Sequence, residues 1–215
     1  MIPNKIALQN EFFRIFDSMN RIYKNGDEYM ATNCARAISD YIKSGVVYDS
    51  SVIGIPSGTY HTSNYIYKGS ATGILQINEG NLKNLLYNTF LTYKNDYDIA
   101  MNVSHNIHAC CIQAYCSLST SGFVFEGGVS IQPESGNGSG GFISFENILY
   151  TKLIACYNTM RSMTSNGNMY HAQELSSAID TYLKSGSVSA SYTLTQWGTP
   201  FGSANGQGRW RNIGL

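Results

Sequence analysis

The chain has 215 residues, and 43% of them are hydrophobic, which is enough to bury a sizeable core. Only 13% are charged, and 14 basic residues balance 14 acidic residues, so the formal net charge is zero. This balance argues against long-range attraction to nucleic acid or to an anionic membrane. A surface poor in charge but rich in Asn, Ser, Thr, Tyr and Gly favours packing against other protein.

The cysteines and the N-terminal sequence indicate the compartment. The five cysteines lack the paired spacing of a secreted disulfide framework, so reduced thiols are expected. The segment Met1–Lys5 has no basic stretch followed by an apolar core, and no apolar run approaches the roughly 18 residues of a membrane span. We therefore expect synthesis in a cytoplasm and no contact with a membrane.

An internal repeat organises the sequence. The stretch Ala37–Gly45 returns near the C-terminus as Ala178–Gly186, and a looser copy at Cys111–Cys116 lies between them. Such spacing predicts three units of roughly 70 residues. An internal repeat determines the overall architecture, so local patterns are interpreted within each unit. We place the units, packed together as one body, at residues 1–78, 79–147 and 148–215.

Each unit is expected to begin with two helices. In unit one, apolar residues between Leu8 and Tyr23 recur at steps of three and four, the period of a helix. The break at Lys24–Asp27 allows Asp27 to cap a second helix from about Glu28 to Lys43. The corresponding segments of units two and three are 82–93, 97–117, 148–163 and 169–184.

Strand-like runs follow each predicted helical pair. Gly-Ser pairs begin at positions 69, 138 and 202 and form a second anchor of the repeat. We interpret these glycine-rich segments as the tips of small β-ribbons. The predicted fold class is therefore α+β, with three tandem repeats, each a helical hairpin followed by a small β-ribbon with a Gly/Ser-rich tip. Whether the units close into a pseudo-threefold ring or form a curved row stays open.

Aligning the second helices of the three units predicts which of their faces is buried. Apolar columns recur at steps of three and one along these helices, whereas the columns between them are polar. The predicted repeat core consists of Ala37, Ile38, Tyr41, Ile112, Tyr115, Ala178, Ile179 and Tyr182.

His105, His108 and Cys110 are the strongest metal-site candidates, because the two histidines stand one helical turn apart. The repeat argues against a metal, since both histidines align with apolar residues of the other units and Cys110 is expected to face outward. Asp96 and Asp98 are better explained as caps of a helix than as ligands of a cation. No metal and no cofactor is therefore predicted.

Catalytic patterns are absent from the sequence. The run Gly136–Gly141 precedes a strand-like pattern, whereas a phosphate-binding loop precedes a helix and contains Gly-Lys-Ser/Thr. No nucleophile elbow occurs, His61 and His171 have no local partner, and no carboxylate pair is indicated. We predict no catalytic residue and no enzymatic activity.

Aromatic residues of the ribbons support an alternative function. Tyr48, Tyr60, Tyr65, Tyr67, Trp197 and Trp210 could stack on sugars, which would make the chain a multivalent glycan-binding module. That function needs the same aromatic at equivalent positions, but Ile74, Phe142 and Gln207 follow the glycine-rich turns. Cross-strand packing or a protein interface accounts for these aromatics better.

A helix that ends in Tyr-Ile/Leu-Lys-Ser-Gly and leads into a glycine-rich β segment occurs at Tyr41–Gly45 and Tyr182–Gly186. It resembles small virion structural proteins of tailed bacteriophages, which usually carry one such unit. Unit two departs from the pattern at Ser117–Thr120, where Lys-Ser-Gly is lost. The resemblance implies a non-enzymatic assembly component and assigns no functional residue.

The resemblance, the repeat and the low charge lead to one functional expectation. We expect a structural component of a bacteriophage virion, as capsid cement (decoration) or as a head–tail component, that acts through protein–protein contacts. Its expected partners are other virion proteins in a multi-copy assembly, with no nucleic acid and no membrane. Its expected location is the virion, after synthesis in the host cytoplasm.

Overall fold

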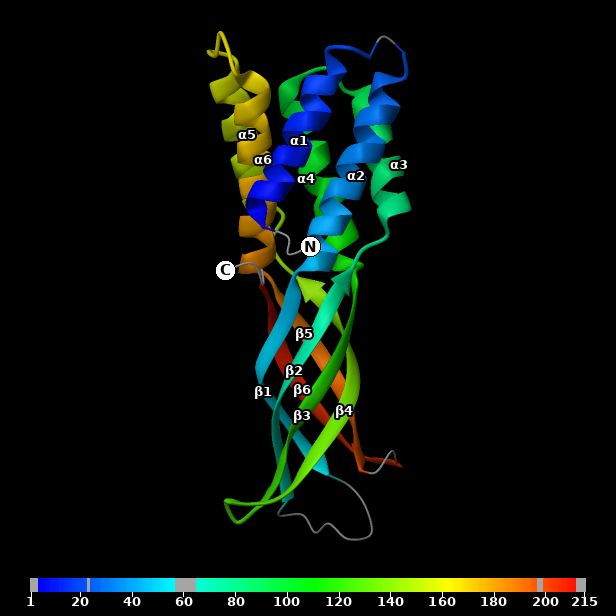
Figure 1. Cartoon of the computed structure of the whole chain (residues 1–215), viewed down its shortest axis with the longest axis vertical. Helices are drawn as coiled ribbons and strands as arrows, with labels where there is room; N and C mark the ends of the chain where they lie inside the picture. The colour runs from blue at the N-terminus through cyan, green and yellow to red at the C-terminus, as the bar shows by residue number, and fades with distance from the viewer. Residues whose placement is uncertain (1–3, 23, 57–64, 197–198, 212–215) are drawn as a thin grey trace.

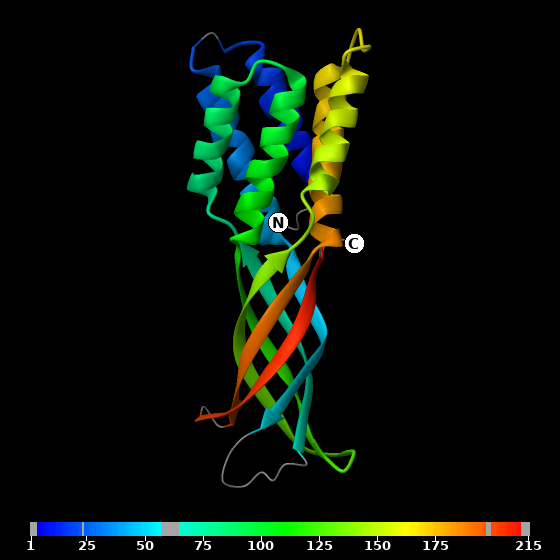
Figure 2. The ribbon, with the colours of Figure 1, turned by 180° about the vertical axis from the view of Figure 1, so that it is seen from behind.

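A computed structural model describes residues 4–22, 24–56, 65–196 and 199–211 of the chain. The molecule is elongated, with a helical head at one end and a β-barrel at the other (Figure 1). The view from behind shows the same division, with the helices at one end of the molecule and the strands at the other (Figure 2). We refer to the level at which the helices lead into the strands as the junction.

The described residues form six helices, which pack in a ring. The sequence neighbours α1 to α6 contact one another in order, and α6 contacts α1, which closes the ring. Each helix buries one apolar stripe toward the centre of the head. The helices are α1 (Lys5–Met19), α2 (Gly26–Ser44), α3 (Glu79–Thr92), α4 (Asp96–Ile112), α5 (Asn147–Met160) and α6 (Gly167–Ser185).

The six strands in the described residues form a closed antiparallel barrel. Neighbours in sequence pair along the whole order from β1 to β6, and β1 also pairs with β6. Closure leaves no unpaired edge in the sheet. The strands are β1 (Val46–Pro56), β2 (Tyr65–Gln76), β3 (Tyr115–Glu126), β4 (Val129–Ile143), β5 (Ser187–Gln196) and β6 (Thr199–Arg211).

The predicted repeat of helical hairpin and β-ribbon is confirmed. The order helix, helix, strand, strand occurs three times, and the sheet closes in a ring. The ring resolves the open choice between a closed arrangement and a row. Closure also explains how short units form a common core, because every helix and every strand has a neighbour on both sides.

The prediction for unit two was out of register. Helix α4 ends at Ile112, and Tyr115 is the first residue of β3 rather than part of a helix. Ile112 is 46% exposed and Tyr115 is 58% exposed, so their assignment to the repeat core was wrong. The other six predicted core residues, from units one and three, are buried.

The length of the loop between the two helices of each unit explains the error. Residues 20–25 and 161–166 connect the helices in units one and three, whereas only residues 93–95 do so in unit two. The second helix therefore starts earlier in unit two. The buried residues show the corrected equivalence, which is Ala31 with Ala100 and Ala172, Ile38 with Ile107 and Ile179, and Tyr41 with Cys110 and Tyr182.

The helix N-termini differ in one detail from the prediction. Asp27 lies inside the first turn of α2, and the residue at the cap position is Asn25, which has a left-handed backbone with φ 57°. Asn166 occupies the equivalent place before α6 with φ 59°. Asn tolerates this conformation better than most residues. Asp27 was therefore wrong as the cap, although a carboxylate in the first turn still complements the helix dipole.

The Gly-Ser pairs do not form the tips of the ribbons. The segment 69–73 lies within β2, and Gly136–Gly141 lies within β4, where it pairs with β3 and β5. The third pair, at Gly202, lies within β6. The connection between β3 and β4 is made instead by Gly127 and Gly128, both with positive φ. The predicted tip segments therefore belong to the strands themselves.

Every second residue in the middle of the second strand of each ribbon is Gly or Ala, and these positions face the barrel interior. A Cβ at Gly138 would lie within 2.5 Å of the Tyr192 ring, and one at Gly73 would meet Leu118. Small residues on one strand therefore make room for large residues on its neighbour. These small inward residues are Gly69, Ala71, Gly73, Gly136, Gly138, Gly140, Ala204, Gly206 and Gly208.

At the junction, one large residue from each ribbon closes the barrel. Leu75, Phe142 and Trp210 are the last inward residues of β2, β4 and β6, and all three are buried. The Trp210 indole Nε1 donates a hydrogen bond to the carbonyl of Ile42, 3.1 Å away, which ties the barrel to α2. The ring of Trp210 also lies 5.4 Å from that of Tyr41.

The residue that follows each second helix is smaller where the residue that closes the barrel beside it is larger. A Cβ at Gly45 would overlap the Trp210 ring, and a Cβ at Gly186 would overlap the Phe142 ring. Unit two has Ala114 at the equivalent place, and the residue that closes the barrel there is the smaller Leu75. The junction therefore needs glycine where the neighbour is aromatic.

We predict that Gly45→Ala destabilises the protein by about 2 kcal/mol, because the new methyl group must displace the Trp210 ring. Urea unfolding monitored by circular dichroism measures the effect. Gly141→Ala is the matched control, since a Cβ there would have no neighbour within 4 Å, and its stability should stay near that of the wild type. Equal destabilisation by both substitutions would contradict the steric explanation.

Candidate functional site

The three metal candidates bind other protein groups. The His105 ring lies 3.3 Å from a carboxylate oxygen of Glu146, and the His108 ring lies 2.8 Å from the Tyr182 hydroxyl. Cys110 accepts a weak hydrogen bond from the amide of Asn81 at 3.7 Å and is buried, so the expectation that it faces outward was wrong. Burial raises the pKa of the Cys110 thiol.

No group of three or more His, Cys, Asp or Glu side chains arranged to hold a metal occurs among the described residues. The acidic pair at the start of α4 takes part in local contacts instead. The side chain of Asn95 caps the helix by accepting a hydrogen bond from the backbone of Asp98, and Asp96 pairs with Arg161 at 3.2 Å. The cap is thus Asn95, one residue before the predicted acidic pair.

A partly formed ring of polar contacts surrounds the junction. The Tyr41 hydroxyl donates to a carboxylate oxygen of Asp180 at 2.7 Å, which joins unit one to unit three. The Tyr182 hydroxyl and His108 share a hydrogen bond that joins unit three to unit two. Tyr41 and Tyr182 occupy equivalent positions, and so do Asp180 and His108. Each tyrosine therefore reaches the same position of the neighbouring unit.

The third contact of this ring is missing. Cys110 stands in place of the tyrosine, and Ser39 stands in place of Asp180 and His108. The Ser39 hydroxyl is fully buried and has no hydrogen-bond partner among the described residues. A thiol side chain is too short to replace a tyrosine hydroxyl. Unit two therefore has no tyrosine at this position, and the Ser39 hydroxyl across from it has no partner among the described residues.

We predict different effects for two substitutions in this ring. Tyr41→Phe should destabilise the protein by about 1–2 kcal/mol, because it removes a hydrogen bond from the buried carboxylate of Asp180. Ser39→Ala should stabilise the protein by about 1 kcal/mol, because it removes a buried hydroxyl that is shielded from water without gaining a protein partner. Chemical denaturation measures both. A large loss for Ser39→Ala would show that this hydroxyl has a partner in solution.

The barrel interior contains a second set of buried polar groups. Asp49 is fully buried, accepts hydrogen bonds from the backbone and hydroxyl of Ser51, and lies 3.5 Å from the Tyr192 hydroxyl. The Tyr67 hydroxyl lies 2.9 Å from that of Thr120. Burial is the main cause that raises the pKa of both tyrosines, and the carboxylate of Asp49 adds to it for Tyr192. These groups satisfy one another inside the barrel.

The five cysteines are unpaired and buried. Burial raises the pKa of the thiols of Cys34 and Cys156 to about 12, and that of Cys116 to about 11. A nucleophilic cysteine needs the opposite, a thiolate stabilised near neutral pH. The cysteines therefore act as small apolar core residues.

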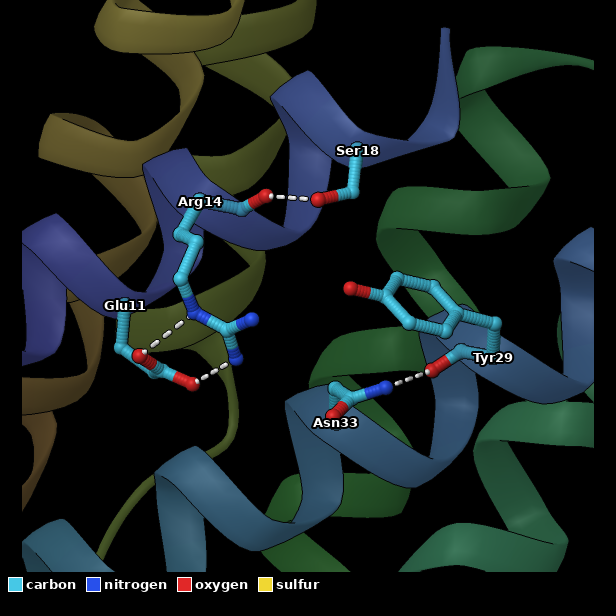
Figure 3. Close-up of polar contacts among 5 residues, drawn as sticks. All are labelled: Glu11, Arg14, Ser18, Tyr29 and Asn33. Atoms are coloured by element: carbon cyan, nitrogen blue, oxygen red, sulfur yellow. Dashed lines mark hydrogen bonds and ion pairs between the residues drawn. The ribbon is translucent and has the colours of Figure 1, made fainter. Parts of the chain in front are cut away.

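The helical head also carries polar side chains on its surface. Arg14 of α1 forms an ion pair with Glu11 one turn earlier, and its guanidinium points toward Tyr29 of α2 (Figure 3). In the same view, Ser18 and Asn33 donate to backbone carbonyls of their own helices. The pairing with Glu11 raises the pKa of Arg14 and lowers that of the carboxylate. These contacts stay within the helical hairpin of unit one.

An apolar cavity of about 190 Å³ lies inside the helical head. All six helices contribute to its wall, so it lies on the axis about which the units repeat. Two layers of equivalent residues line it. The first layer consists of Met30, Ile99 and His171, and the second of Cys34, Val103 and Leu175.

His171 is the titratable group of this cavity wall with the clearest pH response. Its ring stacks on Phe16 at a centroid distance of 4.4 Å and lies 5.1 Å from the Tyr157 ring. Burial lowers the pKa of His171 to about 4, and the charge of Asp96 acts in the opposite direction. The imidazole is therefore neutral at pH 7 and packs as an aromatic ring.

We predict that stability falls as the pH drops from about 6.5 to 4. The unfolded chain takes up a proton on His171 near pH 6.5, whereas the folded chain resists until about pH 4, so acid favours unfolding. His171→Met, which introduces the residue of unit one, should remove about 2 kcal/mol of this pH dependence. Denaturation curves at pH 4.5 and 7 measure it, and an unchanged dependence in the variant would contradict the assignment.

The sequence did not predict the cavity or the polar ring at the junction, and it led to a wrong position for the glycine-rich segments. The cavity and the polar junction ring need the corrected register of unit two, which the sequence repeat alone did not supply. The period-two spacing of glycines in 136–140 and of small residues in 204–208 was a visible signal of inward-facing positions. Of the aromatics considered for sugar stacking, Tyr67 and Trp210 are buried, while Tyr60 and Trp197 lie outside the described residues.

Comparisons of the chain with protein-family models, with curated proteins and with solved structures found no match. Among the described residues, no helix combines the length and apolar character needed to cross a membrane.

Proposed function

We propose that the protein is a non-enzymatic structural component of a bacteriophage virion, as capsid cement or as a head–tail component, and that it acts by burying surface against other virion proteins. The observation that carries this proposal is the closure of three equivalent units around one axis. A body with approximate threefold symmetry suits a position on a threefold axis, or in a ring, of a larger assembly.

The surface of the barrel supports a role in protein contacts. Its outer face midway along the strands is uncharged and rich in hydroxyl and amide side chains. The half far from the helices carries six exposed apolar residues on β1 to β4, which we name the distal apolar patch; the exposed Lys68 lies between two of them. The residues of the patch are Ile53, Ile55, Ile66, Phe123, Val129 and Ile131. Fewer exposed apolar residues of the strands, such as Ile74, Tyr115 and Ile143, lie near the helices.

Exposed apolar side chains on neighbouring strands favour burial against a partner. Val129 is 70% exposed and Ile55 is 69% exposed, so the isolated chain leaves them largely in water. The formal net charge of zero adds little repulsion between neighbouring proteins. The distal apolar patch is therefore the contact surface that we assign to the assembled particle.

A non-enzymatic role agrees with how the polar groups are used. His105, His108 and Asp180 each pair with another side chain, and the thiols are buried. The glycan-binding alternative gains no comparable support, since it required repeated exposed aromatics. We therefore propose only the assembly role.

The first test is the mass of the purified chain in solution, alone and mixed with virion particles of its source. The proposal predicts a free chain of 23.7 kDa that co-sediments in many copies with the particles. A chain that stays free and small in both samples would overturn the proposal.

We predict that the double variant Ile55→Ser/Ile131→Ser lowers co-sedimentation at least about tenfold, because it removes two exposed apolar contacts of the distal apolar patch. Ile74→Ser/Ile143→Ser is the matched control. It makes the same change at exposed positions of the barrel near the helices and should leave binding unchanged. Equal losses in both variants would contradict the assigned surface, and far-ultraviolet circular dichroism verifies that both fold.

A further inference from the structure

The axial cavity of the head differs from ordinary packing defects by its size and its lining. Its volume of about 190 Å³ exceeds the roughly 150 Å³ of an engineered apolar cavity in another protein that stays dry and binds benzene. Cavities of that volume are costly in a close-packed core. A ligand that fills the space would recover the lost contacts.

We propose that the axial cavity is a binding site for a small, uncharged aromatic molecule. The size follows from the cavity volume, which accommodates a single ring of the benzene or toluene type. The lack of charge follows from the wall, which consists almost entirely of apolar atoms, because a buried charge would have no partner there.

The aromatic character follows from the rings in the wall. Phe16, Phe90 and Tyr157 line the cavity from the first helices of the three units. His171 adds a neutral imidazole that already stacks on Phe16. Aromatic pairs gain about 0.5–1.5 kcal/mol beyond the area that they bury, so a ring is favoured over an aliphatic molecule of equal size.

The space arises because the three units differ at equivalent positions. In the layer of Cys34, Val103 and Leu175, unit one contributes the smallest side chain. Replacing Cys34 with the leucine of unit three should therefore fill part of the cavity with a residue that this layer already accepts. Cys116 offers a matched control, because it is buried in the barrel and its equivalents in units one and three are Val47 and Val188.

Benzene is the probe, and methyl resonances of Ile99, Val103 and Leu175 report its binding by nuclear magnetic resonance. We expect saturable shifts of these methyl groups, unchanged methyl resonances of Val47 and Leu118 in the barrel, and a higher melting temperature with benzene. Benzoate should cause none of these effects, since its charge would be buried without a partner.

We expect Cys34→Leu to weaken benzene binding at least about tenfold and to raise the stability of the ligand-free protein. Cys116→Val should bind like the wild type. If Cys34→Leu does not fold, Val103→Leu replaces it as the filling variant. Absence of saturable shifts in the wild type would overturn the proposal, and so would equal binding by a folded filling variant, which would place benzene elsewhere. None of these results depends on assembly into a particle.

Discussion

Closing a barrel with only six strands is the constraint on which the rest of the structure depends. The interior is too narrow for large side chains on every strand, so most inward positions midway along the second strand of each ribbon hold Gly or Ala. The first strands supply larger residues such as Tyr192 and Leu118. The same complementarity continues at the junction, where Gly45 and Gly186 accept the aromatic rings that close the barrel. This packing fixes the position of the helices relative to the barrel.

The units and their element types could be predicted because units one and three kept the same spacing. Ala37 and Tyr41 lie in the core, as do the equivalent residues Ala178 and Tyr182 of unit three, which the helical periodicity indicated. Closure into a ring could not be predicted, because it depends on pairing between β1 and β6, which lie at opposite ends of the sequence. Local patterns carry no information about such a contact.

Two errors have physical causes that a single sequence conceals. The shorter loop at 93–95 shifted the second helix of unit two, and a match based on Tyr115 followed the wrong spacing. Glycine is common in turns, so the glycine-rich segments suggest flexible tips when only the sequence is considered. Their alternation places them on one face of a strand instead, as in Gly136 and Gly138. The polar ring and the cavity depend on both corrections, which is why the sequence did not indicate them.

The polar ring at the junction shows what a single chain can do that three identical chains cannot. In a homotrimer, any residue chosen for the axis appears three times, so a change from Tyr to Cys would remove all three contacts together. Here Cys110 occupies the position of the tyrosine in one unit only, and Tyr41 and Tyr182 make the contact in the other two. Fusion of the units thus allows mutations to be tested one at a time near the axis. One unit of the chain can therefore change to contact a partner while the other two units keep the threefold arrangement.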